Sequence, residues 1–320
     1  MVDICDTDTT RRPLVPSPLG KRDIIGVVAP SGPVDINDLN AGVHFLHQWG
    51  FRVVVGRNAA QRVGYLAGCD EERGSDVNAM LRATEVRAIA FARGGYGIMR
   101  ILESIDRDAV ERDPKPLIGM SDITALQLSL YARCGLVTFS GPMVGGQIAQ
   151  GLDAHSEASV LESLLTPLAG RELLPKNQSV LKVLRRGSAS GPLLVGCLSL
   201  ITALIGTSHC PNFDGTILLV EDVNEAPYRI DRMMTHLKLA GVLDALSGMI
   251  LGHFLGSGDR SIRSSVERRA LELTSDTSIP LVSGYPHGHA LPNLTLPCGM
   301  PVELETSPLR FSVSGQKRVA

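Results

Sequence analysis

The chain has 320 residues and a mass of 34.2 kDa, a length that predicts two domains or one large α/β unit. Its 31 Lys and Arg residues nearly balance its 33 Asp and Glu residues, giving a formal net charge of −2, which argues against a protein built to coat nucleic acid or an anionic membrane. A charged fraction of 20% with 44% hydrophobic residues excludes a largely disordered chain.

The cysteine spacing and the N-terminal residues bear on the cellular compartment. The six cysteines lie far apart and form no CxxC pair, which is unlike a disulfide framework or a zinc ribbon and favours a reducing compartment. Arg11 and Arg12 have no apolar stretch behind them, and three prolines interrupt the next residues. We therefore expect a mobile tail at residues 1–20 and no secretory signal.

Residues 21–145 have the alternating pattern of an α/β domain. Short β-rich runs occur at Ile24–Ala29, Phe51–Val55, Val86–Ala92, Leu117–Met120 and Leu136–Phe139. Segments with apolar residues at helical spacing lie at residues 35–50, 98–105 and 123–135. Strands that alternate with helices predict right-handed crossovers and a mostly parallel sheet, in which ligands bind at the carboxyl ends of the strands.

Residues 146–187 are interpreted as the connection between two domains, with one helical stretch at Ser156–Leu165. Strands and helices return at residues 188–320, which predicts a second domain. Its expected elements are Thr216–Val220, Ile230–Leu239, Met249–Phe254, Ile262–Leu273, Pro280–Val282 and a terminal hairpin in PVELETSPLRFSVSG.

One uncharged stretch, from Gly187 to Phe213, invites comparison with a membrane span. Prolines, glycines and hydroxyl side chains interrupt it, whereas a lipid-facing helix needs about 20 predominantly apolar residues. Its apolar run Leu193–Ile205 predicts a buried core helix instead, and we expect a soluble chain.

Ser121 is the first candidate for chemistry. The β-rich run Leu117–Met120 ends just before it, and a helical segment follows at once. A serine on such a turn presents its hydroxyl at the sheet edge, and the next N–H, from Asp122, lies at a helix N-terminus where negative charge is favoured. The alternative is that Ser121 only caps the helix.

The second candidate is the loop Arg93-Gly94-Gly95-Tyr96-Gly97, which also follows a β-rich run. Its glycines let backbone N–H groups approach a ligand closely. The loop lacks the Lys and Ser/Thr of a P-loop and the GxGxxG spacing. An ordinary glycine-rich turn remains the alternative.

Glu221 and His289 are the third and fourth candidates. Glu221 ends a buried apolar run, where its carboxylate could orient a histidine or pair with Arg229 or Arg232. His289 lies in Gly284-Tyr285-Pro286-His287-Gly288-His289-Ala290, and an imidazole is the usual general base near neutral pH. The HxH spacing also suggests a metal site, but no carboxylate or cysteine cluster is adjacent to complete one.

Together these segments supply a nucleophile, two loops for an oxyanion, an acid and a base, in the order Ser, Glu, His. The same order occurs in α/β-hydrolases, although triads are defined by geometry and not by order.

The combination resembles the LD-carboxypeptidase family, which includes the microcin-immunity peptidases. The matching segments are VVAPSGP at residues 27–33, ARGGYG at 92–97, PLIGMSDIT at 116–124, Gly206-Thr207, ILLVEDVNEAPYRIDRMM at 217–234 and GHALPNLTLPCG at 288–299. They span nearly the whole chain in the family's order.

The resemblance implies a fold and an activity. The fold would be an N-terminal parallel-sheet domain of flavodoxin or glutaminase type and a C-terminal β-containing α/β domain, with the site between them. The enzyme would be a cytoplasmic, homodimeric serine peptidase of peptidoglycan recycling, without metal or other cofactor. It would remove the terminal D-alanine from murein tetrapeptide by cutting after L-lysine or meso-diaminopimelate.

The resemblance also implies roles for individual residues. By motif position, Ser121 corresponds to the nucleophile, Glu221 to the orienting acid and His289 to the base. The backbone N–H groups of Asp122 and Gly95 correspond to the oxyanion donors. Arg93, with Gly94 beside it, is a candidate for binding a substrate carboxylate because arginine forms good carboxylate forks.

One departure from the family concerns Val195-Gly196-Cys197, where many relatives have Gly-Gly-Asn. Without a matched histidine, Cys197 is interpreted as a buried core residue and not as a thiol nucleophile.

Three other functions are weighed against the murein peptidase. A microcin-type aminoacyl-nucleotide hydrolase would resemble relatives with an aromatic residue between the domains, but residues 145–186 contain none and the single Trp is Trp49. A generic α/β-hydrolase esterase would have a second glycine after the serine, which GMSDI lacks. A non-catalytic ligand-binding module would not need all three triad residues.

Overall fold

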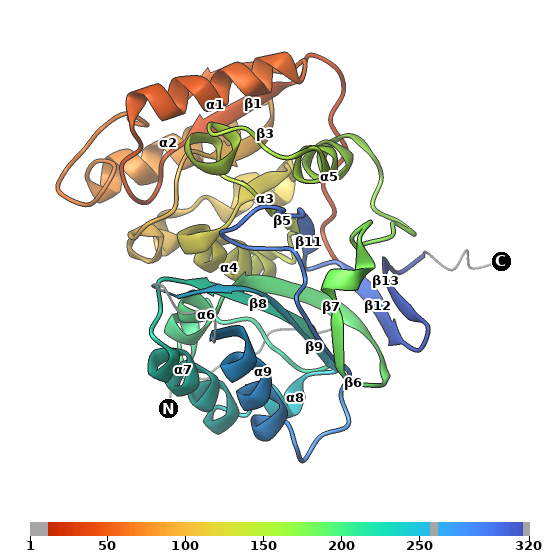
Figure 1. Cartoon of the computed structure of the whole chain (residues 1–320). Helices are drawn as coiled ribbons and strands as arrows, with labels where there is room; N and C mark the ends of the chain where they lie inside the picture. The colour runs from red at the N-terminus through yellow and green to blue at the C-terminus, as the bar shows by residue number, and fades with distance from the viewer. Residues whose placement is uncertain (1–11, 257–261, 316–320) are drawn as a thin grey trace.

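Two β-sheets with helices around them form the computed structural model, which describes residues 12–256 and 262–315 (Figure 1). In Figure 1 the first sheet and its helices lie above the second sheet, and α4 (Thr124–Cys134) lies between them. We call the first sheet with its helices the first half and the second sheet with its helices the second half. Helix α4 packs against β7 (Ser188–Cys197) and α6 (Leu198–Leu204) of the second half. The helix that follows Ser121 is therefore part of the interface between the two halves.

The first sheet has the strand order β11-β5-β4-β3-β1-β2. Its strands are β1 (Ile24–Val28), β2 (Arg52–Val55), β3 (Val86–Phe91), β4 (Leu117–Gly119), β5 (Thr138–Ser140) and β11 (Leu296–Cys298). The first five run parallel to their neighbours, whereas β11 pairs antiparallel with β5. The strand β11 thus comes from the C-terminal part of the chain and completes the sheet that carries Ser121.

The helices of the first half are α1 (Ile36–Gln48), α2 (Asp70–Arg82), α3 (Arg107–Arg112), α4 and α5 (Ala154–Leu165). Helix α1 begins where predicted because the carboxylate of Asp35 accepts a hydrogen bond from the N–H of Asn37, and its apolar face buries Leu39 and Leu46. Shorter turns lie at Ile98–Arg100, Leu102–Ser104, Ser121–Ile123 and Val144–Ile148.

The second sheet has the order β13-β12-β7-β8-β9-β10-β6. Its parallel centre is formed by β7, β8 (Ile217–Val223), β9 (Gly248–Leu255) and β10 (Leu281–Ser283). Antiparallel strands flank it: β6 (Lys182–Arg185), β12 (Pro301–Thr306) and β13 (Leu309–Val313). The helices are α6, α7 (Pro227–Leu239), α8 (Val242–Ala245) and α9 (Ile262–Leu273), and a short turn lies at Gln178–Val180. The predicted α/β class and the terminal hairpin are confirmed.

Two predicted helices differ from the structure. Residues 98–105 form two short 3₁₀ turns, because Gly97 has a φ of +128° before the first turn and Asp106 caps a new helix, α3. The predicted core helix Leu193–Ile205 is wrong in its first half, which is the end of β7; only Leu198–Leu204 is helical. A parallel strand buried on both faces has a continuous apolar sequence, which periodicity alone does not distinguish from a buried helix.

The predicted tail falls partly within the described residues. Residues 1–11 lie outside them. Leu14 forms a β-bridge with Leu136 and donates its N–H to Gly135 at 2.8 Å, and Leu19 is buried. This part of the predicted tail therefore packs on the first half of the chain. The division into domains at residues 21–145 and 188–320 stays a prediction.

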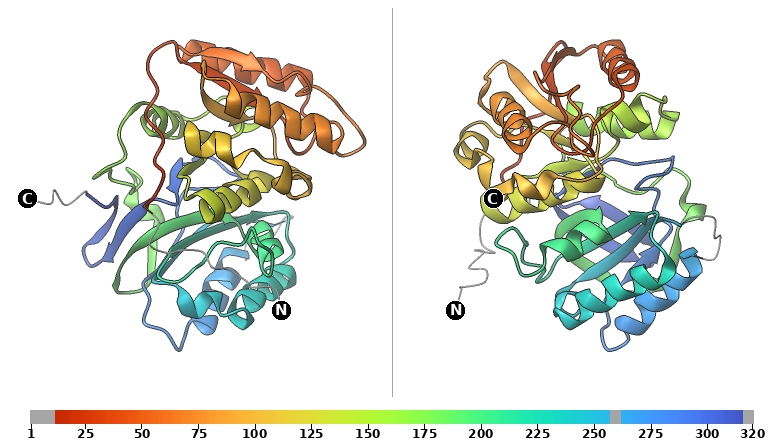
Figure 2. Two further views of the ribbon diagram at one scale, coloured as in Figure 1. Left: turned by 180° about the vertical axis from the view of Figure 1, so that it is seen from behind. Right: turned by 90° about the vertical axis from the view of Figure 1, so that its left-hand side faces the viewer.

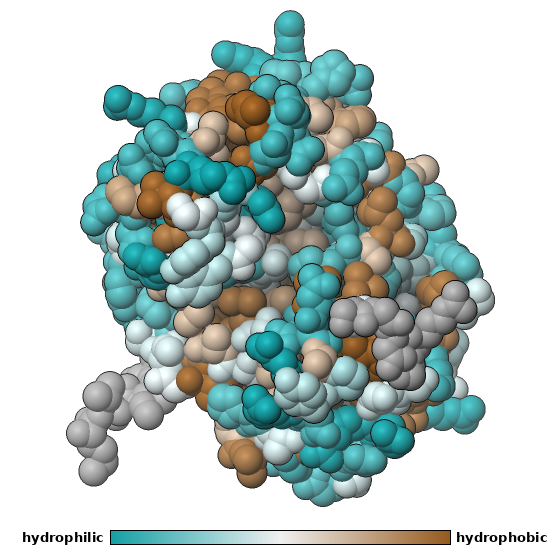
Figure 3. All heavy atoms as spheres, turned by 60° about the vertical axis from the view of Figure 1, so that its left-hand side comes forward, coloured by the Kyte–Doolittle hydropathy of each residue, from teal (hydrophilic) through white to brown (hydrophobic). Residues whose placement is uncertain are grey.

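The molecule has the same two layers from every side that the figures show, and its surface is mixed in polarity. Figure 2 shows the same two layers from behind and from the side, and Figure 3 shows a face on which hydrophilic side chains surround smaller hydrophobic areas. Within residues 12–256 and 262–315, no helix has both the length and the apolar character needed to cross a membrane.

Candidate active site

Ser121 lies on a strained turn between β4 and α4. Its φ is +63°, a value that residues other than glycine rarely adopt. A helix-capping serine has an extended backbone and a side chain that accepts a backbone hydrogen bond. Ser121 has neither feature, and the residues at the N-cap positions of its 3₁₀ turn and of α4 are Met120 and Ile123. The capping interpretation is therefore wrong, and a strained serine at a strand end is typical of a functional position.

The glycine-rich loop at residues 92–97 lies directly against this turn. A Cβ atom added to Gly94 would be only 2.8 Å from the Oγ of Ser121 and 3.4 Å from the N of Asp122, so only glycine allows this approach. Gly95 has a φ of +108°, and its N–H donates no hydrogen bond to any residue that the structure describes. The loop thus leaves the backbone N–H of Gly95 available one residue from the contact of Gly94 with Ser121.

Asp122 fixes the loop to the turn through its side chain. Its buried carboxylate accepts a hydrogen bond from the N–H of Ile98 at 2.9 Å. Burial raises the pKa of this carboxyl above its ordinary value. Arg93 is exposed and donates to the carbonyl oxygen of Pro33 at 2.6 Å, so its side chain connects this loop to the neighbouring loop at residues 30–33.

Glu221 and His289, which are far apart in the sequence, form a hydrogen-bonded pair. The Nδ1 of His289 lies 2.7 Å from the Oε2 of Glu221, which is 1% exposed at the carboxyl end of β8. Because a carboxylate only accepts, Nδ1 carries the proton and Nε2 of the neutral ring is left as an acceptor. Arg229 pairs with Glu225 at 2.8 Å, so the alternative of an Arg229–Glu221 salt bridge is wrong.

Two opposing effects set the pKa of His289. Burial acts to lower it, but the hydrogen bond that Nδ1 donates to Glu221 and the charge of that carboxylate outweigh burial, so the pKa of His289 lies above its ordinary value. The pair therefore stabilises the imidazolium form, which a general base becomes when it takes a proton.

His287 does not join His289 in a chelating pair. It is fully buried, its Nδ1 lies 2.8 Å from the carbonyl oxygen of Leu294, and its Nε2 lies 3.1 Å from the Oγ of Ser140. Both ring nitrogens are engaged there, whereas His289 faces Glu221. The HxH spacing is thus not the sign of a metal site, since the two rings have separate partners.

Cys197 is a buried neighbour of Glu221 in the strand pairing. Burial first, and then the charges of Glu221 and Asp222, raise the pKa of its thiol well above the ordinary value. The thiolate that a nucleophile requires is therefore disfavoured. The backbone N–H of Cys197 donates to the Oγ1 of Thr124 at 3.1 Å, which joins the end of β7 to the start of α4.

The structure brings the Ser121 turn and the His289 loop together through other residues. Among the described residues no hydrogen bond joins Ser121 to His289. Asn293 connects their neighbours: its Nδ2 lies 3.3 Å from the Sδ of Met120, and its Oδ1 accepts from the N–H of Gly288 at 3.1 Å. The sequence alone assigns Asn293 no role, although GHALPNLTLPCG, one of the matching segments, contains this residue.

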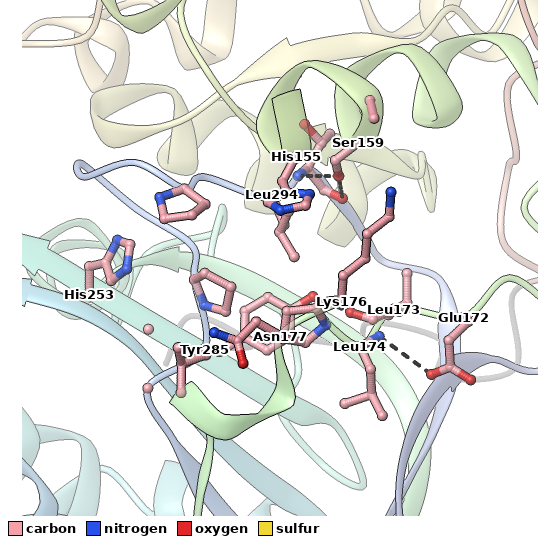
Figure 4. Close-up of a pocket in the computed structure, with 18 of the residues that line it drawn as sticks. His155, Ser159, Glu172, Leu173, Leu174, Lys176, Asn177, His253, Tyr285 and Leu294 are labelled. Carbon is pink, nitrogen blue, oxygen red and sulfur yellow. Dashed lines mark hydrogen bonds between the residues drawn. The ribbon is translucent and has the colours of Figure 1, made fainter. Parts of the chain in front are cut away.

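A cavity of about 630 Å³ lies beside the histidine loop (Figure 4). Its walls come from α5, residues 171–180, the end of β9 and the loop around Tyr285, and its labelled residues include His253, Lys176 and Asn177. At one wall, a Cβ added to Gly252 would be 3.2 Å from the Cβ of Glu221. The cavity therefore adjoins the Glu221–His289 pair along the same sheet edge, but none of the predicted catalytic residues lines it.

Comparisons with known proteins cover both halves of the chain. Residues 25–141 match the LD-carboxypeptidase N-terminal domain and residues 190–304 match the LD-carboxypeptidase C-terminal domain. A probable murein peptide carboxypeptidase of Bacillus subtilis (strain 168) is 34% identical over 302 residues, covering 91% of this chain and 92% of the relative.

Solved structures agree with this assignment. A microcin C7 self-immunity protein superimposes with a TM-score of 0.86 and 27% identity, covering 95% of this chain and 99% of that protein, and one structure of that type contains aspartyl sulfamoyl adenosine. A muramoyltetrapeptide carboxypeptidase from Oxalobacter formigenes superimposes with a TM-score of 0.78 and 29% identity, covering 90% and 97% of the two chains.

Proposed function

The chain belongs to the LD-carboxypeptidase family, and from this premise we propose that it releases the terminal D-alanine from murein tetrapeptide through Ser121, His289 and Glu221. As a member of this family the chain is a serine-type carboxypeptidase. The bond cut would be the one after L-lysine or meso-diaminopimelate, and the product would enter peptidoglycan recycling in the cytoplasm. A homodimer is the assembly that we propose.

The first half of the reaction forms an acyl-enzyme. The Oγ of Ser121 attacks the carbonyl carbon of the penultimate residue while its proton passes to the Nε2 of His289. The tetrahedral oxyanion accepts hydrogen bonds from the N–H groups of Gly95 and Asp122. The C–N bond then breaks, and the imidazolium gives its proton to the amine of the leaving D-alanine.

The second half releases the shortened peptide. A water molecule attacks the ester carbonyl while His289 takes one of its protons, and the oxyanion is held by the same two N–H groups. Collapse of this intermediate breaks the ester bond, and the proton returns from His289 to the Oγ of Ser121. Glu221 keeps the ring oriented throughout and stabilises the imidazolium.

The observation that carries the proposal is the buried bond between Glu221 and His289. It fixes the tautomer that leaves Nε2 as an acceptor. The strained backbone of Ser121 and the close approach of Gly94 to it support the same assignment.

The test is release of D-alanine from purified murein tetrapeptide, followed by mass spectrometry with and without a chelator. We expect release that is insensitive to the chelator and that falls by at least about 10³-fold in Ser121→Ala, as is usual when a triad nucleophile is removed. Equal release by Ser121→Ala would refute Ser121 as the nucleophile, and no release by the wild-type chain would refute the substrate.

A second candidate substrate is an aminoacyl nucleotide. The similarity to the microcin C7 self-immunity protein favours it. Against it, residues 145–186 contain no Phe, Tyr or Trp that could stack on a base, and Tyr285 in the adjoining cavity is buried with its hydroxyl hydrogen-bonded to the carbonyl oxygen of Leu173. Incubation with aspartyl sulfamoyl adenosine under the same conditions would distinguish the two substrates.

A further inference from the structure

We infer that Asn293 is a positioning residue for the reaction, because its side chain holds the backbone N–H of Gly288, before the general base His289, next to the side chain of Met120, before the nucleophile Ser121. This inference rests on the proposed function for the roles of His289 and Ser121. Asn293 is itself completely buried, and within the described residues it forms no hydrogen bond with the hydroxyl of Ser121 or the ring of His289.

Gly288 is the residue whose backbone needs to be restrained by its neighbours. This glycine precedes His289 and has a φ of +125°, a conformation that other residues rarely adopt. A Cβ here would lie 2.6 Å from the Oε2 of Glu221, so glycine is required for the close approach of the loop to the acid. The cost is that glycine restrains its own backbone poorly, and the direction of the next residue, His289, then depends on external contacts.

Asn293 and Gln147 supply those contacts on both sides of Gly288. The Oδ1 of Asn293 accepts from the N–H of Gly288 at 3.1 Å, and the Nε2 of Gln147 donates to the carbonyl oxygen of Gly288 at 3.2 Å. The Nδ2 of Asn293 donates to the Oε1 of Gln147 at 2.6 Å and closes the ring. The two side-chain amides are oriented unambiguously, because an N–H can only donate and a carbonyl oxygen can only accept.

The same asparagine reaches the nucleophile turn. Its Nδ2 lies 3.3 Å from the Sδ of Met120, the residue before Ser121. Its backbone N–H donates to the Oγ of Ser156 on α5 at 2.8 Å. Asn293 is thus anchored to two elements of the first half of the chain while it holds the loop that carries the base. Loss of its side chain removes the partner of the Gly288 N–H without touching the Glu221–His289 bond.

The test measures how fast diisopropyl fluorophosphate modifies Ser121, followed by mass spectrometry. In this reaction the Oγ–P bond forms, the P–F bond breaks, fluoride leaves, and the hydroxyl proton passes to His289. We expect Asn293→Ala to slow the modification about 10- to 100-fold, the usual effect of losing a residue that orients a reacting group, with the same apparent pKa as the wild type. A residue that only stabilises the fold would leave the rate constant of the folded enzyme unchanged, and that result would overturn the inference.

Two further variants make the test independent of how well Asn293→Ala folds. Gln147→Ala removes the other half of the ring from a half-buried position and should slow the modification by a smaller factor. In the double variant the rate constant of modification should fall by less than the product of the two single-variant factors, because both side chains act through Gly288. A fall equal to that product would mean that the two side chains act independently. Asn78→Ala is the matched control. The side chain of Asn78 also hydrogen-bonds to two backbone groups, the carbonyl oxygen of Ser104 and the N–H of Asp106, but these lie far from the site, so the modification rate should not change.

The outcomes separate this inference from the proposed function. If Ser121 of the wild type is modified but no D-alanine is released from tetrapeptide, the substrate is wrong and the modification rates still decide the role of Asn293. If Ser121 of the wild type is not modified at all, the nucleophile assignment and the positioning role both fail.

Discussion

The pKa of His289 depends on its contact with Glu221, and this dependence can be measured from the pH profile of the reaction. The protonated imidazole cannot accept a proton, so kcat/KM should fall as the pH drops through the pKa of His289, which Glu221 holds above its ordinary value. Glu221→Gln removes the negative charge. We expect the acidic limb of the profile to move down by about one pH unit or more, and kcat to fall by about 10³–10⁴ because the tautomer is no longer fixed.

Glu225→Gln provides the control for this prediction. It makes the same chemical change four residues further on, where the carboxylate pairs with Arg229 and not with His289. Its acidic limb should coincide with that of the wild type. An unmoved or upward-shifted limb in Glu221→Gln would show that the titrating group is not His289.

The sequence predicts some residues of the site better than others, for a physical reason. Ser121 and Glu221 each stand where a buried β-rich run ends in a polar residue, which is a local signal. Asn293 has no such signal, because its partner Met120 lies 173 positions away in the chain and the contact exists only after folding. The positive φ of Ser121 likewise follows from the packed turn and not from the residue type.

Among the elements, the parallel strands β1 to β5 are predicted from the sequence, whereas the buried end of β7 and the polar helix α2 are not. The sequence pattern does not predict helix α2, because only Val77, Met80 and Leu81 of its 13 residues are buried hydrophobics. Its position depends on contacts from outside the helix. Lys115 is one of them: its side chain is 1% exposed, and its Nζ donates to the carbonyl oxygens of Met80, Leu81 and Ala83, at or just beyond the C-terminus of α2.

Lys115 therefore stabilises the C-terminus of helix α2, and we expect it to have no part in the reaction. Burial lowers the pKa of its ammonium group, yet the hydrogen bonds satisfy carbonyls that the end of a helix leaves free. We expect Lys115→Met to lower the free energy of unfolding by about 2–4 kcal/mol, since a charged donor to buried acceptors is lost, while kcat/KM stays unchanged. Urea denaturation followed by circular dichroism measures the change.

A lysine whose own side chain is exposed serves as the comparison. The side chain of Lys182 is 60% exposed and pairs with the buried Glu267, which also has Arg263 and Ser283 as partners, so Lys182→Met should cost no more than about 1 kcal/mol. Equal stability of Lys115→Met and the wild type would mean that the three carbonyls find other partners. A loss of activity without a loss of stability would mean that Lys115 influences the site.

At the scale of the whole molecule, the two halves are joined by a shared strand and by side-chain hydrogen bonds as well as by packing. The strand β11 of the C-terminal part is the edge of the first sheet. His209 provides a second connection, because its Nδ1 lies 2.7 Å from the Oγ of Ser129 on α4 and its Nε2 lies 2.9 Å from the Oε1 of Glu103. Unfolding one half would remove a strand or a buried partner from the other.

The chain should consequently unfold in one cooperative transition, although proteins of this length often unfold domain by domain. We expect a single calorimetric peak whose calorimetric and van't Hoff enthalpies agree. His209→Ala leaves the buried hydroxyl of Ser129 without its partner, which should cost about 1–3 kcal/mol and lower the midpoint of the whole peak by a few degrees. Two resolved peaks, or a shift confined to part of the peak, would mean that the halves are independent folding units and that β11 adds to the first sheet after that sheet has folded.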